Sequence, residues 1–202
     1  MNKNIILDNG AKSYRGTLLI LGGARSGKSH FAETCIKTLS PPWVYLATAR
    51  INDDEEMHQR ILRHQADRGN EGWLTVEEPL EIWRVLERYT QTPVLLDCLT
   101  LWLTNLLLEK HDISAATTGL LESLSTRQAP TVLVGNEVGL GIVPENALAR
   151  RFRDEAGRLH QSLARVVGQV VFMAAGLPLV LKNETSPLVA GFGAQNSLWS
   201  RL

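Results

Sequence analysis

The fold of this chain is decided by the stretch Gly22-Gly23-Ala24-Arg25-Ser26-Gly27-Lys28-Ser29. An apolar run at residues 17–21 precedes it, and residues 28–39 carry apolar side chains at roughly helical spacing. A G-x-x-x-x-G-K-[ST] motif between a strand and a helix predicts a phosphate-binding P-loop, because its glycines let successive N–H groups point at phosphate oxygens. We expect Lys28 to reach the β- and γ-phosphates of a nucleoside triphosphate and Ser29 to bind Mg²⁺. The alternative interpretation is an ordinary glycine-rich turn.

Length and composition predict one domain without a broad charge field. The 202 residues are 44% hydrophobic, which suffices for one buried core. The 21 basic and 21 acidic side chains cancel, which argues against non-specific binding to nucleic acid or anionic lipid. The longest apolar run, residues 166–181, is interrupted by two glycines and a proline, so we expect buried strands there and no membrane span. Cys35 and Cys98 form no C-x-x-C pair, which fits a reduced, cytoplasmic protein.

Further strand-like runs alternate with helical patterns along the chain. They occur at residues 43–47, 73–76, 94–96, 131–134 and 170–173. A charged helix is expected from residues 52–54 to about Arg68, and a long helix is expected to open at Pro144-Glu145. This alternation predicts an α/β P-loop domain with a mostly parallel central sheet flanked by helices. The expected boundaries are an N-terminal extension at 1–16, the domain at 17–182 and a C-terminal tail at 183–202.

A carboxylate for Mg²⁺ is expected at the end of the apolar run 94–96. The run ends in Asp97, which is the form of a Walker B strand, whose acidic residue helps to hold Mg²⁺ in P-loop enzymes. Ser29 and Asp97 are therefore the candidate metal ligands. The alternative interpretation of Asp97 is an aspartate that ends a strand or caps a helix. No histidine has ligand spacing with carboxylates or thiols, so the sequence supports no other metal.

A stripe of cationic and imidazole side chains is expected on the charged helix. Arg60, His64 and Arg68 are spaced at i, i+4 and i+8, so they lie near one face of a helix. Two nearby cations favour the neutral imidazole, which is a nucleophile, and they would attract a phosphate chain. Asp67 is placed to orient the ring. The alternative interpretation is a solvated charged helix face, and spacing alone does not decide between the two.

The motifs of two other classes of phosphate-handling protein are missing from the sequence. A regulatory GTPase would carry an N-K-x-D motif for guanine recognition, and none occurs. A protein kinase would carry H-R-D and D-F-G motifs, which are also missing.

Several segments in a fixed order resemble one family. Besides the P-loop, the chain contains ATA at 47–49, EM-x-x-RI-x-x-H at 56–64, Trp73 followed by Glu77, NEVG-x-GIVPEN at 136–146, LARRFRD at 148–154, and Gly157. Together they resemble the bifunctional adenosylcobinamide kinase/adenosylcobinamide-phosphate guanylyltransferase family of cobalamin biosynthesis. The resemblance spans residues 18 to 182, and the 136–146 stretch is far more specific to the family than the P-loop is.

The resemblance implies two reactions on a RecA-like P-loop fold that assembles as a homotrimer. ATP or GTP would phosphorylate the aminopropanol hydroxyl of adenosylcobinamide, and GTP would then transfer GMP to adenosylcobinamide phosphate through a histidine, giving adenosylcobinamide-GDP and pyrophosphate. By motif position this histidine is His64, with Lys28 as the second catalytic residue. The nucleotide contacts implied are Gly22, Gly23, Ala24, Arg25, Ser26, Gly27, Lys28, Ser29, Ala47, Thr48, Ala49, Gln65, Ala66, Asp67, Arg68, Glu77 and Asp97.

The chain departs from the family pattern at three places, one of which is the extension after Lys182, for which the family pattern has no counterpart. Some members have two adjacent histidines where this chain has Arg63-His64, and the family often has Asn-Gln where this chain has His160-Gln161. Two alternatives use the same P-loop: a small-molecule kinase without a covalent intermediate, and a nucleotide-binding module without catalysis.

Overall fold

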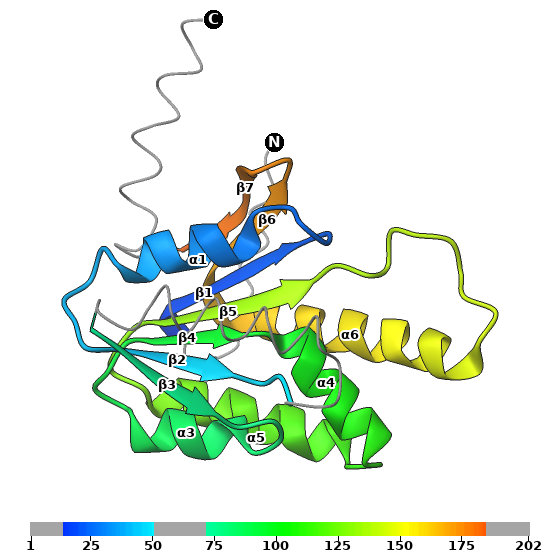
Figure 1. The fold of residues 1–202 in the computed structure, drawn as a ribbon, viewed down its shortest axis with the longest axis horizontal. Helices are drawn as coiled ribbons and strands as arrows, with labels where there is room; N and C mark the ends of the chain where they lie inside the picture. The colour runs from blue at the N-terminus through cyan, green and yellow to red at the C-terminus, as the bar shows by residue number, and fades with distance from the viewer. Residues whose placement is uncertain (1–13, 51–71, 185–202) are drawn as a thin grey trace, which may run out of the picture.

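The computed structural model describes residues 14–50 and 72–184. Within them, seven strands form one sheet in the order β3-β2-β4-β5-β1-β6-β7, and each neighbouring pair is parallel except β6 with β7 (Figure 1). The elements are β1 (Tyr14–Gly22), α1 (Lys28–Ile36), β2 (Trp43–Ala47), β3 (Trp73–Glu77), α3 (Ile82–Arg88), β4 (Val94–Asp97), α4 (Leu99–Leu108), α5 (Ile113–Thr126), β5 (Thr131–Asn136), α6 (Ala147–Val166), β6 (Val167–Ala174) and β7 (Leu177–Asn183). The expected α/β fold, with a mostly parallel sheet and a P-loop between β1 and α1, is confirmed.

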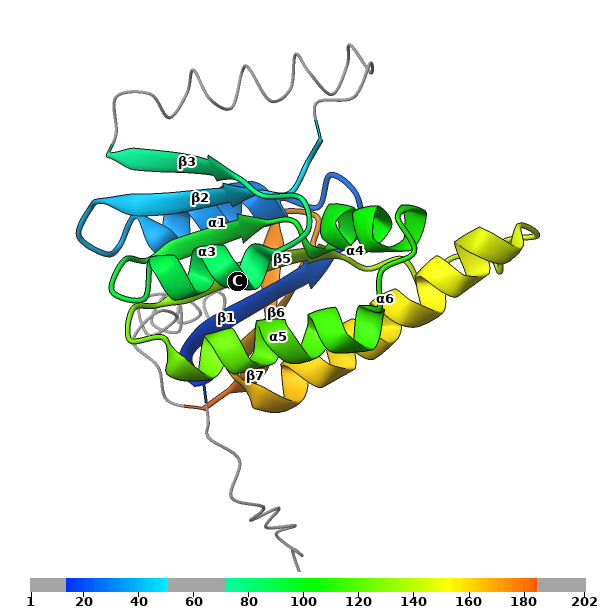
Figure 2. The same ribbon diagram turned by 90° about the horizontal axis from the view of Figure 1, so that it is seen from below.

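The central strands are buried on both faces. In β1, Leu18 and Ile20 pack with α1 on one face of the sheet. Leu19 and Leu21 pack with α3, α4, α5 and α6 on the other face (Figures 1 and 2). Because side chains alternate along a strand, a strand covered on both faces needs apolar residues at every position. The continuous apolar runs of the sequence therefore correspond to the middle of the sheet.

Strand β7 corrects the expectation of buried strands throughout residues 166–181. β6 is almost entirely buried, but β7 is an antiparallel edge strand whose Leu177, Leu179 and Leu181 are 55%, 59% and 58% exposed. The two strands are joined at Ala175-Gly176, where both residues have positive φ (52° and 80°). Positive φ at both central positions is typical of a tight hairpin turn. The glycine that argued against a membrane span is thus part of a turn.

Helix α6 begins later than the sequence predicts. Asn146 is its N-cap, with Oδ1 accepting the N–H groups of Leu148 (2.8 Å) and Ala149 (3.2 Å). Pro144-Glu145 therefore belongs to the preceding loop.

The helices α3, α4 and α5 were not predicted, and the charged helix expected from 52 to 68 lies outside the described residues. The sheet itself reaches from residue 14 to residue 183.

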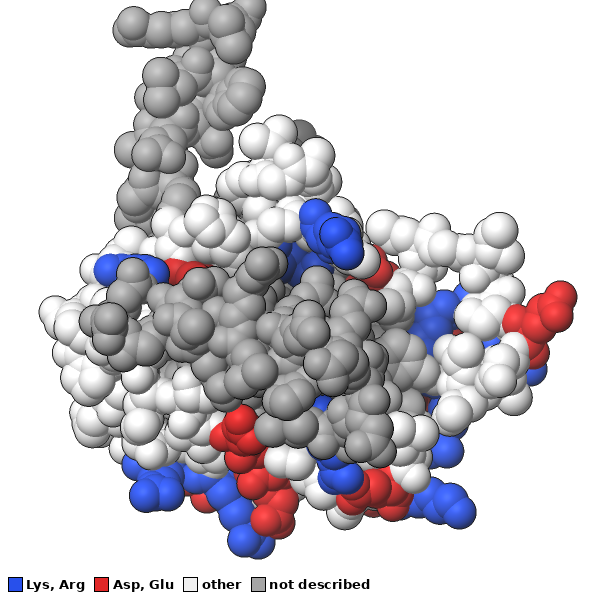
Figure 3. Space-filling view, viewed as in Figure 1, with Lys and Arg blue, Asp and Glu red and all other residues white. Residues whose placement is uncertain are grey.

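Charged side chains of both signs are mixed on the surface. Figure 3 shows acidic and basic groups of the described residues interleaved on the face seen in Figure 1, without one continuous patch of either sign. Of the helices within residues 14–50 and 72–184, none combines the length and the apolar character needed to cross a bilayer.

Gly22, at the junction of β1 and the P-loop, is expected to tolerate no side chain. It has a φ of 153°, and a Cβ there would lie 2.4 Å from Met173 O and 2.8 Å from Ser26 Oγ. We expect Gly22→Ala to lower the free energy of unfolding by ~2 kcal/mol or more, through strain and overpacking. Gly23→Ala is the matched control, because a Cβ at Gly23 meets nothing within 4 Å. Denaturant unfolding measures both variants, and equal stability would contradict this account.

Candidate functional site

The predicted nucleotide-binding residues of four strands lie at one edge of the sheet. β1 runs into the P-loop at Gly22, while β2, β3 and β4 end at Ala47, Glu77 and Asp97. The register aligns these ends, because Ala47 is opposite both Glu77 and Asp97, and Gly22 is opposite Asn136 at the end of β5. Open α/β sheets bind ligands outside the carboxyl ends of their strands. The structure therefore brings residues far apart in sequence to the edge where a ligand is expected.

The P-loop folds over the side chain of its own lysine. Lys28 Nζ donates to Gly23 O (2.5 Å) and to Ser26 Oγ (3.4 Å), and Lys28 is only 7% exposed. The loop also rests on the β6–β7 turn, since Gly176 N–H donates to Ser26 O (3.1 Å). A Cβ at Gly27, which has a φ of 93°, would lie 3.2 Å from Gly176 Cα. The unpredicted hairpin thus packs against the P-loop.

The remaining P-loop residues lie at its tip and at the start of α1. Ala24 and Arg25 are exposed, and Arg25 has a positive φ of 54°. Ser29 is the second residue of α1 and is half-buried. The tip is therefore open to solvent, while the lysine and the serine are held at the helix N-terminus.

Lys28 lies within electrostatic reach of Asp97. Burial lowers the pKa of Lys28, and the negative charge of Asp97 opposes that shift. Burial raises the pKa of the neighbouring Cys98 thiol to about 11, so this thiol is uncharged at neutral pH and Asp97 is the anion that acts on the lysine. Asp97 Oδ2 also accepts a hydrogen bond from Tyr45 OH (3.1 Å). The expected phosphate-binding lysine and metal-binding carboxylate are therefore neighbours.

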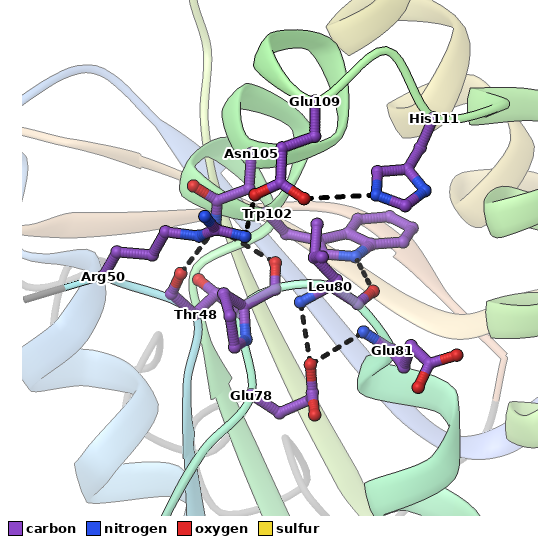
Figure 4. Close-up of polar contacts among 10 residues, drawn as sticks. Thr48, Arg50, Glu78, Leu80, Glu81, Trp102, Asn105, Glu109 and His111 are labelled. Carbon is purple, nitrogen blue, oxygen red and sulfur yellow. Dashed lines mark hydrogen bonds and ion pairs between the residues drawn. The ribbon is translucent and has the colours of Figure 1, made fainter.

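A hydrogen-bond network joins the ends of β2, β3 and β4 beneath the site. Thr48 Oγ1 donates to Cys98 O (2.7 Å) and accepts from Cys98 N–H (3.0 Å). Asn105 Nδ2 donates to Thr48 O (2.9 Å) and to Pro79 O (3.0 Å) (Figure 4). Thr48 is fully buried, so its hydroxyl supports the strand ends. Ala47 and Ala49 on either side are only half-buried.

Asn105 was not predicted as a site residue, although the sequence carries a signal for it. It is the one amide in the apolar helix α4, and it is 9% exposed. A buried amide must find hydrogen-bond partners, so a lone asparagine among leucines indicates a structural contact. Its partner Thr48 O is 57 positions away in the sequence. A pattern of neighbouring residues therefore cannot predict this hydrogen bond.

A second set of contacts fixes the chain after β3 and the residue Arg50. Glu78 Oε1 accepts the N–H groups of Leu80 and Glu81, both at 2.9 Å, and Trp102 Nε1 donates to Leu80 O (2.7 Å). Arg50 forms an ion pair with Glu109, whose Oε2 lies 3.3 Å from His111 Nε2 (Figure 4). These groups surround the carboxyl ends of β2 and β3.

The 136–146 stretch leads from the last residue of β5 to the N-cap of α6, and residues 137–145 form a loop beside the P-loop. Glu137 N–H donates to Gly22 O (2.9 Å), and Asn136 N–H donates to Thr100 Oγ1 (2.7 Å). Leu140, Ile142 and Val143 in the middle of this loop are 82%, 97% and 57% exposed. The loop thus has a fixed start at the sheet edge and an apolar, exposed middle.

Part of the predicted site lies outside the described residues. This part comprises Arg60, His64, Gln65, Ala66, Asp67 and Arg68. The nucleophile and four of the implied nucleotide contacts, residues 65–68, therefore stay predictions from the sequence.

Comparison with known proteins identifies close relatives. Residues 18–181 match the family described as cobinamide kinase / cobinamide phosphate guanyltransferase. The bifunctional adenosylcobalamin biosynthesis protein CobP of Pseudomonas aeruginosa is 46% identical over 170 residues, covering 82% of this chain and 97% of that protein. The protein CobU of Escherichia coli, of the same description, is 39% identical over 186 residues, covering 82% and 99%. The flagellar accessory protein FlaH of Methanocaldococcus jannaschii is 11% identical, with a TM-score of 0.47 and coverage of 87% and 82%.

Proposed function

The chain belongs to the cobinamide kinase / cobinamide phosphate guanyltransferase family of enzymes, and we propose that it catalyses both reactions of that name. It phosphorylates the aminopropanol hydroxyl of adenosylcobinamide with ATP or GTP, and then transfers GMP from GTP to adenosylcobinamide phosphate. The observation that carries this proposal is the convergence of Lys28, Asp97 and the 136–146 loop at one sheet edge. The 136–146 loop is the segment most specific to the family, and the P-loop would bind the phosphates of the nucleotide.

In the kinase step, the acceptor hydroxyl oxygen attacks the γ-phosphorus of the nucleotide. The bond from the γ-phosphorus to the bridging oxygen breaks, the nucleoside diphosphate leaves, and the hydroxyl proton passes to solvent. The P-loop N–H groups and Lys28 stabilise the negative charge on the phosphate oxygens, which is the main form of catalysis in phosphoryl transfer. The hydrogen bond to Gly23 O holds the Lys28 ammonium group within the loop, where these oxygens would bind.

The residues at the end of β4 and the start of α1 fit Mg²⁺. Mg²⁺ prefers oxygen ligands and binds through one or two protein groups together with phosphates and water. Ser29 and Asp97 supply one hydroxyl and one carboxylate, and Tyr45 OH orients the Asp97 carboxylate. Bound there, Mg²⁺ would neutralise charge on the phosphates.

In the transferase step, we propose that His64 is the nucleophile. Its imidazole attacks the α-phosphorus of GTP, pyrophosphate leaves, and a phosphoramidate bond to GMP forms. A phosphate oxygen of adenosylcobinamide phosphate then attacks the same phosphorus and releases the histidine, giving adenosylcobinamide-GDP. Direct transfer would require GTP and adenosylcobinamide phosphate, two large anions, to be held in line at the same time. The histidine intermediate replaces this single displacement by two successive displacements.

Assembly and location are part of the proposal. The resemblance to the family supports a homotrimer, which light scattering after size-exclusion chromatography would measure. A cytoplasmic location is supported by Cys35 and Cys98, both free and buried.

Labelled nucleotides test the proposed function directly. The protein is incubated with adenosylcobinamide, Mg²⁺ and either γ-labelled ATP or α-labelled GTP, and the corrinoids are separated. We expect label from ATP in adenosylcobinamide phosphate and label from GTP in adenosylcobinamide-GDP. Phosphorylation without GMP transfer would show that the protein is a small-molecule kinase only. The absence of any corrinoid-dependent turnover would favour a nucleotide-binding module without catalysis.

Asp97→Asn is expected to weaken both reactions through Mg²⁺. The amide keeps the shape and an acceptor for Tyr45 OH, but it removes the charge that helps to hold the cation. We expect rates at limiting Mg²⁺ to fall about tenfold or more and to recover in part with excess Mg²⁺. Tyr45→Phe is the control, because it removes the hydrogen bond and keeps the charge. An Asp97→Asn enzyme that matches the parent at limiting Mg²⁺ would make Asp97 a structural residue only.

A further inference from the structure

The contacts of Glu137 connect helix α6 to the first glycine of the P-loop. Glu137 is the first residue after β5, and its N–H donates to Gly22 O (2.9 Å). Its carboxylate accepts the N–H of Gly139, and Oε2 lies 3.9 Å from Nδ1 of His160 on α6. One residue therefore contacts the P-loop through its backbone and α6 through its side chain.

His160 lies in a notch of β5 that a glycine leaves open. The residue is 7% exposed, and a Cβ at Gly135 would lie 2.9 Å from His160 Nε2. Burial lowers the pKa of His160, and the charge of Glu137 opposes that shift, so the ring is neutral at neutral pH. A carboxylate beside Nδ1 favours the tautomer with its proton on that atom. The ring thus presents an N–H dipole to Glu137 across a gap longer than a hydrogen bond.

The loop between Glu137 and Asn146 lies against α6 at both ends. Asn146 caps the helix at the end of the loop, and Glu137 at its start faces His160 further along the helix. Between these anchors lie the exposed apolar side chains of Leu140, Ile142 and Val143. A group of exposed apolar side chains beside a phosphate-binding loop indicates a contact surface for a ligand.

We propose that His160 and Glu137 are positioning residues that fix the base of this loop against the P-loop, so that its apolar side chains contact the corrinoid acceptor. The proposal rests on the proposed function, which supplies the acceptor. A corrin ring is a large macrocycle with extensive apolar surface, and its contact with these side chains removes that surface from water. Loss of the pair would let the loop shift while the P-loop still binds nucleotide phosphates.

Kinetics of matched variants test the pair. His160→Leu and Glu137→Ala remove the contact, whereas His160→Asn keeps a donor for the carboxylate. We expect the KM for adenosylcobinamide in the kinase reaction to rise about tenfold or more in the first two, as small misplacements near a site do, and to recover in His160→Asn. The Kd for GTP should stay within about twofold of the parent value. The double variant should be no worse than Glu137→Ala alone, because Glu137→Ala already removes the contact with His160.

Two further variants test the apolar contact itself. Ile142→Ser should raise the same KM, because Ile142 is 97% exposed in the middle of the loop. Leu108→Ser is the matched control, since Leu108 is also exposed (64%) but ends α4. Equal KM values for adenosylcobinamide in the Ile142→Ser variant and the parent would overturn the acceptor contact.

Hydrogen exchange provides a readout that does not depend on turnover. The Gly139 N–H is bonded to the Glu137 carboxylate, and it should exchange faster in His160→Leu. If His160→Leu does not fold, Glu137→Ala carries the kinetic test, because the Glu137 side chain is 24% exposed. Unchanged exchange and unchanged KM in an active enzyme overturn the positioning role alone. A parent protein without turnover of adenosylcobinamide overturns the proposed function and the acceptor contact with it.

Discussion

Replacing Lys28 with alanine is expected to reduce both the kinase and the guanylyltransferase rates by at least about 10²-fold while the protein stays folded. The ammonium group is held in the P-loop by Gly23 O and Ser26 Oγ, where the phosphates of the nucleotide are expected. Both reactions develop charge on phosphate oxygens, so both lose the same stabilisation. Folding should survive, because burial disfavours the charged form of Lys28 and its removal relieves that cost.

The measurement compares turnover with circular dichroism and an unfolding curve. Lys37→Ala is the matched control, since Lys37 follows the other end of α1 and is exposed. It should change neither rate. A folded Lys28→Ala protein that retains either rate would show that the P-loop does not serve that reaction.

The central part of the fold was predictable from the sequence because it is buried on both faces. The run at 43–47 coincides with β2, and the runs at 94–96 and 131–134 lie within β4 and β5. Such strands need apolar residues at every position, so a continuous apolar run indicates them. Residues 177–181 of β7 are also apolar without a break, yet they lie at the edge of the sheet and are mostly exposed, which is why burial was wrongly predicted there. Its turn at Ala175-Gly176 also lacks the asparagine or aspartate that usually marks a hairpin.

The candidate site was predictable where one motif or one strand end carries the chemistry. The P-loop and Asp97 meet this condition, because parallel strands bring their carboxyl ends to one edge whatever lies between them. The contact between His160 and Glu137 could not be predicted in this way, because it joins the middle of helix α6 to the residue after strand β5. Only the packing of α6 against the sheet brings the two residues together. The same holds for Asn105, whose two acceptors follow β2 and β3.

His64→Ala is expected to abolish GMP transfer and to leave the phosphorylation of adenosylcobinamide largely intact. The kinase step uses the γ-phosphate and the P-loop, whereas the transferase step needs a nucleophile for the α-phosphate. The histidine must be neutral to attack, and Arg60 and Arg68, one turn to either side on a helix, disfavour its protonated form. They would also balance the charge that develops on the α-phosphate. These residues lie outside the described part of the structure, so the expectation rests on the sequence and on the family.

The chemistry of the covalent bond makes this expectation testable without an acceptor. Label from α-labelled GTP should stay with the protein in alkali and be released by acid, because a phosphoramidate is acid-labile, and label from γ-labelled GTP should not be retained by this route. His58 is the matched control: it lies six residues before His64, and at about 100° per residue a helix places the two on different faces. His58→Ala should therefore still be labelled, and peptide mapping of the parent should place GMP on the peptide with His64. Label that persists in His64→Ala, or that maps to His58, would move the nucleophile to another residue.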